Sequence, residues 1–103
     1  MQLMIFFFFF PVMALAAPNI ENGALLFKKC VSCHGSDAMG KKSQNAPMIA
    51  GQYDWYIKSQ IIAVQKKERW NSNSQKMFPF VKKLTEQEID DLAAYISGLK
   101  LKK

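Results

Sequence analysis

The sequence predicts a small all-α domain. Apolar residues recur at helical spacing in three segments of the 103-residue chain, and no segment alternates in the way typical of a strand. Two long irregular stretches, residues 35–52 and 68–84, carry many Gly, Pro, Ser, Asn and Lys residues. Loops of this length count against so small a domain unless they pack on a bound cofactor.

The first predicted helix runs from about Ile20 to Lys29. Asn19 is a suitable N-cap, and Glu21 is favourable in the first turn. Its apolar positions recur at helical spacing, at Ile20, Ala24, Phe27 and Val31. Gly23 disfavours the helix locally, which indicates a close approach by another helix at this point.

The second predicted helix spans about Tyr53 to Lys67, with Asp54 near its start. Its expected apolar face consists of Ile57, Ile61, Ile62 and Val64.

The third predicted helix has the clearest start. Thr85-Glu86-Gln87-Glu88 forms a capping box, and Leu84 with Ile89 forms the accompanying hydrophobic staple. The stripe that follows comprises Ile89, Leu92, Ala93, Ile96 and Leu99.

The N-terminal residues resemble a secretion signal. Leu3 to Phe10 is an apolar run, and Ala14-Leu15-Ala16 is an A-x-A cleavage pattern, which predicts a signal peptide over residues 1–16, cleaved after Ala16, and a domain over 17–103. The run is shorter than the roughly 20 residues of a spanning helix. Because no Lys or Arg precedes it, a start farther upstream and retention as an anchor both stay open.

Cys30-Val31-Ser32-Cys33-His34 contains both cysteines and the single histidine of the chain. This C-x-x-C-H order is typical of covalent haem attachment, with two thiols for the haem vinyl groups and the imidazole as proximal iron ligand. A thioredoxin-like dithiol normally opens a helix after a strand, and none is predicted here. A zinc site needs four ligands, and a Cys30–Cys33 disulfide would close a strained loop of little benefit.

The whole domain resembles the class I c-type cytochromes, in particular single-haem units of small bacterial cytochromes related to the two-haem periplasmic type. Gly23 and Phe27 stand at the positions of the family's Gly and aromatic residue in the first helix, and Tyr95 where the last helix crosses them. Residues 46–52 resemble its Pro-x-Leu-x-Gly-Gln run, and residues 77–84 its Met-x-x-x-Ala-x-x-Leu run. The resemblance implies a fold of three main helices and long loops wrapped around one covalently bound haem c. It also has two departures: the Gly expected shortly before Arg69 is absent, and residues 78–80 are unusually bulky.

Met77 is the predicted distal ligand. The second iron face needs a soft or nitrogen ligand, no second His exists, and the polar segment 71–76 can carry Met77 across that face. The rivals are Met39, which lies close to His34 in sequence, and Met48, at a position where the family usually has a buried aliphatic residue. The resemblance further implies that the Pro47 carbonyl accepts a hydrogen bond from the His34 Nδ1.

Four other side chains could contact the haem propionates: Arg69, Trp70, Tyr53 and Trp55. Ordinary packing or a solvated surface role is an equal alternative for each of them.

The formal net charge of +6 suggests how the protein meets its partners. Lysines flank the segments expected to frame the haem, namely Lys28, Lys29, Lys41, Lys42, Lys76, Lys82 and Lys83. They would steer the protein towards redox partners with acidic surfaces, although a lysine run is usually just a solvated face. No nucleic-acid-binding motif is present.

Two axial ligands leave no open coordination position, which predicts a one-electron carrier and not an enzyme. The signal-like N-terminal residues predict that this carrier is periplasmic. The alternatives are a haem sensor or enzyme with an open sixth position, and a haem subunit of a larger oxidoreductase. A haem-to-haem homodimer is also left open.

Overall fold

The computed structural model describes residues 2–9 and 16–101. The longer helices are α1 (Ile20–Phe27), α3 (Asp54–Gln65) and α5 (Glu86–Ser97). Shorter helical turns connect them: the 3-10 turn η1 (Lys28–Cys30), α2 (Val31–His34), η2 (Lys42–Gln44), η3 (Ser74–Lys76) and α4 (Phe78–Val81). The described residues contain no strand, apart from a single antiparallel bridge between Lys41 and Ala46. The predicted all-α class with three main helices is therefore confirmed for the described chain.

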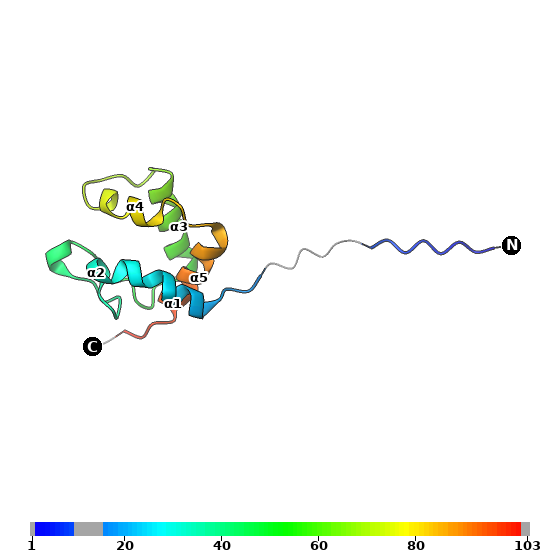
Figure 1. Cartoon of the computed structure of the whole chain (residues 1–103), viewed down its shortest axis with the longest axis horizontal. Helices are drawn as coiled ribbons and strands as arrows, with labels where there is room; N and C mark the ends of the chain where they lie inside the picture. The colour runs from blue at the N-terminus through cyan, green and yellow to red at the C-terminus, as the bar shows by residue number, and fades with distance from the viewer. Residues whose placement is uncertain (1, 10–15, 102–103) are drawn as a thin grey trace.

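Helices α1 and α5 cross in direct contact, as Figure 1 shows near the base of the helical body. Gly23 lies at the crossing, where a Cβ atom would collide with the Asp91 carbonyl oxygen of α5. Beside it, the rings of Phe27 and Tyr95 pack with their centroids 5.5 Å apart. The close approach predicted from Gly23 is confirmed.

Asp91 of α5 stabilises the crossing with α1 through hydrogen bonds. Its buried carboxylate accepts from the Asn19 backbone N–H at 2.8 Å, the Asn22 side-chain amide at 2.9 Å and the Gln87 amide at 2.8 Å. These bonds, the Asn19 backbone N–H first among them, hold the pKa of Asp91 below its usual value although burial opposes the shift.

The predicted caps of α1 and α5 are present. The Asn19 side chain accepts a hydrogen bond from the Asn22 backbone N–H, and Thr85 and Glu88 form a reciprocal capping box. Of the apolar positions at helical spacing in α1, Phe27 is buried beside Gly23, whereas Ile20 is 56% exposed. Asn19 and Asn22, on either side of Ile20, both bond to Asp91 of α5, so α5 reaches this turn but leaves the Ile20 side chain exposed.

Helix α3 packs on α5, and α4 packs on α3. Ile57, Ile61 and Val64 of α3 are buried, as predicted, and Ile62 packs at the edge of the core. The α5 stripe supplies Ile89, Leu92, Ala93 and Ile96 to the same core. Helix α4 was not predicted: it lies within a stretch expected to be irregular, with Pro79 in its first turn, where a missing N–H is tolerated.

Residues 2–9 form no helix, and their large apolar side chains are exposed. In the described ranges, no helix has the length and apolar character needed to cross a bilayer. The predicted A-x-A cleavage pattern lies partly outside the described residues, since residues 10–15 are not described.

Candidate haem site

The C-x-x-C-H run lies on a nearly continuous helical path. Helix α1 continues through η1 into α2, so Cys30, Cys33 and His34 follow one another around the end of this path. Gly35 then ends it with φ +86°, a conformation that suits glycine, while its N–H bonds to the Val31 carbonyl at 2.8 Å. The helix was expected to end near Lys29, and the structure extends it through the motif.

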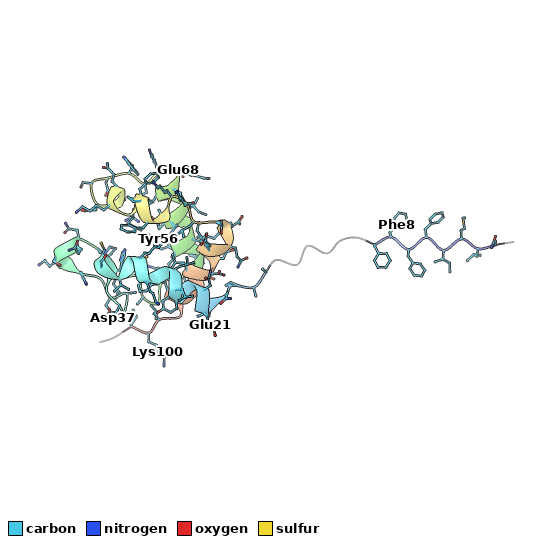
Figure 2. The ribbon with its side chains drawn as sticks, viewed as in Figure 1. Phe8, Glu21, Asp37, Tyr56, Glu68 and Lys100 are labelled. Carbon is cyan, nitrogen blue, oxygen red and sulfur yellow. The ribbon has the colours of Figure 1, made fainter. Side chains whose placement is uncertain are left out.

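Cys30, Cys33 and His34 line one large pocket of about 310 Å³. Its walls come from segments far apart in the sequence, and Figure 1 shows the α2 and α4 regions as two arms of the helical body. Tyr56, on α3, lies between those arms in Figure 2 and also lines the pocket. The α2 side contributes Cys30, Cys33, His34 and Pro47; the α4 side contributes Met77, Phe80 and Val81; the inner wall contributes Ile57, Ile61, Leu92 and Ile96.

His34 is oriented by the backbone opposite it. The residue is 7% exposed, and its Nδ1 lies 3.0 Å from the Pro47 carbonyl oxygen. Because a carbonyl can only accept, this contact requires the proton on Nδ1, which leaves the Nε2 lone pair free for a metal.

Gly40 supports the same contact. Its N–H donates to the His34 carbonyl at 2.8 Å, and a Cβ atom there would lie 2.7 Å from the Ala46 oxygen and 2.8 Å from the Pro47 carbonyl carbon. With φ +87°, this position suits glycine on two grounds.

Met77 reaches the pocket from the other arm. It is partly buried against the core, and its N–H bonds to the Ser74 carbonyl at 3.0 Å. The buried Ser74 hydroxyl in turn accepts from the Asn71 N–H at 2.8 Å, which fixes the loop before Met77.

The rival methionines are placed differently. Met39 packs against the core and is not among the residues that line the pocket. Met48 does line it, but from the same arm as His34, and it is 50% exposed, whereas the family position is usually buried.

The environment of Cys30 favours haem attachment over a dithiol redox site. Cys30 and Cys33 form no disulfide. Burial raises the pKa of the Cys30 thiol, the neighbouring Cys33 adds to the rise, and the Lys29 ammonium opposes it. Reactive dithiols need a lowered pKa, so the thioredoxin-like alternative is disfavoured.

The lining fits a haem better than a hydrated metal ion. Two thiols, an imidazole with a free nitrogen and a thioether surround a largely apolar space of a size typical of cofactor pockets. No group of three or more His, Cys, Asp or Glu residues in the described ranges could hold a metal ion, which excludes a zinc cluster there.

Of the four propionate candidates, Arg69 alone lines the pocket, where its Nη1 donates to Gln60 Oε1 at 3.1 Å. Tyr53 stacks on Trp55 with centroids 5.7 Å apart, and neither lines this pocket. Trp70 packs on Phe78 instead. Sequence reasoning missed Tyr56 and Gln60, although the periodicity of α3 places them one turn apart, each directly before one of the buried residues Ile57 and Ile61.

Comparisons with known proteins agree with this arrangement. Residues 20–100 match the protein-family model described as Cytochrome c. Cytochrome c-554(548) of Halomonas halodenitrificans is 37% identical over 69 residues, which cover 67% of this chain and 82% of that protein. Cytochrome c4 of Pseudomonas aeruginosa is 26% identical over 96 residues, covering 82% of this chain and 48% of that protein.

The fold has a solved counterpart. The crystal structure of reduced recombinant cytochrome c4 from Pseudomonas stutzeri matches with a TM-score of 0.73 and 25% identity, over 79% of this chain and 48% of that one. The chain thus spans about half the length of these cytochromes c4 and most of the length of the Halomonas protein. The resemblance seen in the sequence is confirmed, and the chain belongs to the cytochrome c family.

Proposed function

We propose that this protein is a one-electron carrier whose haem c is attached to Cys30 and Cys33 and held axially by His34 and Met77. The observation that carries the proposal is the meeting of these four side chains in one apolar pocket, with His34 and Met77 on different arms. Membership of the cytochrome c family supports haem-based electron transfer.

The chain's own residues would orient the proximal ligand and keep water away from the haem. His34 keeps its proton on Nδ1 through the Pro47 carbonyl, so that its Nε2 faces the pocket as a neutral donor. The inner wall of Ile57, Ile61 and Leu92 excludes water. Bound here, a haem supplies a one-electron couple, and a thioether ligand favours a raised potential. With both axial positions filled, no site remains for a substrate, which is why carriage is favoured over catalysis.

Export to the periplasm is part of the same proposal. The apolar run and A-x-A pattern support a signal peptide cleaved after Ala16. Mass spectrometry of the mature protein tests it: a chain starting at Ala17 supports cleavage, and a full-length chain in the membrane fraction supports an anchor.

Exposed lysines support a redox partner with an acidic surface. Seven of them lie around the pocket-bearing arms, and Lys29 and Lys76 line the pocket itself. Association with such a partner should weaken steeply as salt rises. Nucleic acid remains an unexpected partner, and sedimentation would detect a haem-to-haem homodimer.

Absorption spectra of the oxidised and reduced holoprotein test the central proposal. A low-spin spectrum with a weak ferric Met–iron band, lost in Met77→Ala, is the expected result. A high-spin spectrum that shifts with carbon monoxide would instead support a sensor or enzyme with an open sixth position. Co-purification with a catalytic subunit would make the protein part of a larger oxidoreductase.

A further inference from the structure

Lys67 has a backbone conformation that disfavours lysine. It follows the end of α3 with φ +58°, where its N–H bonds to the Val64 carbonyl at 3.0 Å. Glycine adopts this left-handed conformation freely, whereas a residue with a side chain is strained there. The sequence resemblance led us to expect a glycine shortly before Arg69, so the chain places a lysine where glycine would suit the backbone. Such strain persists where the surrounding structure uses it.

The Lys67 ammonium lies over two aromatic rings that contact each other. Its Nζ lies 5.2 Å from the centroid of the Trp70 ring and 5.0 Å from that of Phe78. The two rings meet edge to face, with centroids 5.4 Å apart at 84°. An ammonium group within about 6 Å of a ring centroid is attracted by the ring quadrupole, and here both rings contribute. Lys67, Trp70 and Phe78 form what we call the lysine–aromatic clamp.

The lysine–aromatic clamp joins the two ends of the loop that carries Met77. Trp70 lies at the start of that loop, and Phe78 follows Met77 directly and packs against the core. The Met77 carbonyl accepts from the backbone N–H groups of Phe80 at 2.9 Å and Val81 at 3.2 Å, so Met77 is fixed to the first turn of α4. A displacement of Phe78 therefore displaces Met77 in the pocket.

We propose that Lys67 is a positioning residue that keeps Met77 in the haem pocket through the lysine–aromatic clamp. This inference rests on the proposed ligation by Met77. The strained φ of Lys67 reduces the free energy of unfolding of the whole domain. What it provides in return is local, because the cation–π contacts hold the loop that carries Met77.

Imidazole provides the test, since it competes with Met77 for the sixth position of the ferric holoprotein. We expect Lys67→Gly to raise the association constant for imidazole by about five- to thirtyfold, if each ring contributes as an exposed cation–π contact does. Lys67→Arg retains the cation and should bind imidazole nearly as the parent does. Lys66→Gln is the matched control, because it removes an equal charge from an exposed neighbour that makes no side-chain contact with the rings.

Urea unfolding gives a second measurement, because a purely structural role for Lys67 would lower the urea concentration at which Lys67→Gly unfolds. Glycine relieves the positive φ at residue 67, so Lys67→Gly should unfold at the same or a higher urea concentration than the parent. Tighter imidazole binding combined with undiminished global stability is the signature of a local positioning role.

Two results would overturn the proposal separately from the proposed function. If Lys67→Gly and Lys66→Gln bind imidazole equally, the clamp does not position Met77, while ligation still stands on the Met77→Ala spectrum. If Lys67→Gly loses global stability in proportion to its gain in imidazole binding, Lys67 is an ordinary structural residue. An unchanged spectrum in Met77→Ala would remove the ligation itself, and with it any role for Lys67 in positioning the ligand.

Discussion

The substitution Gly23→Ala should destabilise the protein although it improves the helix in which it lies. In an isolated helix, alanine is favoured over glycine by about 1 kcal/mol. At the crossing of α1 and α5, the added methyl group meets the Asp91 carbonyl oxygen, and lies 2.7 Å from the Tyr95 Cβ and 2.8 Å from the Asp91 carbonyl carbon. Backbone atoms and a Cβ cannot rotate away as the end of a side chain can.

The geometry sets the size of the loss. Ordinary contact begins at 3.4 Å, so the Tyr95 contact alone requires the helices to separate by at least 0.7 Å. Overpacking of this kind costs about 1–3 kcal/mol. The separation also stretches the hydrogen bonds that join Asp91 to Asn19 and Asn22, each worth about 1.5–3 kcal/mol when one partner is charged. After the gain in helix propensity, we expect a net loss of about 2–4 kcal/mol.

Urea unfolding of the holoprotein, followed by far-UV circular dichroism, measures this loss. Gly98→Ala, at the end of α5, is the matched control, because a Cβ there would find its nearest atoms at 3.5 Å. That control should unfold within about 0.5 kcal/mol of the parent. If Gly23→Ala proves as stable as Gly98→Ala, the close crossing does not limit residue 23, and the reasoning is wrong.

Three further substitutions follow from contacts in the described chain. Gly40→Ala should push the Pro47 carbonyl away from the His34 imidazole, which makes the imidazole a weaker donor and raises the reduction potential measured by voltammetry. The control Gly51→Ala, with φ +70° but no contact with Pro47, should leave that potential unchanged. The lowered pKa of Asp91 means that its carboxylate stabilises the fold above pH 4 and that this contribution is lost as the pH falls through the folded-state pKa. Acid titration of stability should therefore show a shallower loss below pH 4 in Asp91→Asn, which is already less stable at neutral pH; parallel curves would contradict this. Lys58→Ala breaks ion pairs with two acidic residues of α5 at 3.3 and 2.8 Å, yet should cost less than about 1 kcal/mol in urea unfolding, because the ammonium is partly exposed.

Local sequence signals predicted the three long helices well because each signal acts within a few residues. The capping box at Thr85 and the N-cap at Asn19 specify where α5 and α1 begin, whatever lies around them. Helix α4 escaped prediction because four residues with an internal proline carry too little periodicity. The exposure of Ile20 escaped prediction for another reason: helical spacing identifies an apolar face, but not which of its residues the partner helix covers.

The sequence predicted the chemical groups of the candidate site better than the packing that brings them together. The spacing of Cys30, Cys33 and His34 predicts the haem because attachment requires that order of groups along the chain. Their meeting with Met77 in one pocket depends on packing between arms distant in sequence, and family resemblance supplied that link.

Residues that would position the proposed ligands give weaker sequence signals still. Gly40 is one glycine among five, and Lys67 one cation among fourteen Lys and Arg residues. In the structure, the first lies against the backbone that orients His34, and the second lies over the rings beside Met77. Both have positive φ, a conformation that is relaxed for glycine and strained for lysine. At Gly40 the residue type satisfies the backbone. At Lys67 the side chain makes the positive φ unfavourable, and the cation–π contacts of its ammonium with Trp70 and Phe78 offset this strain.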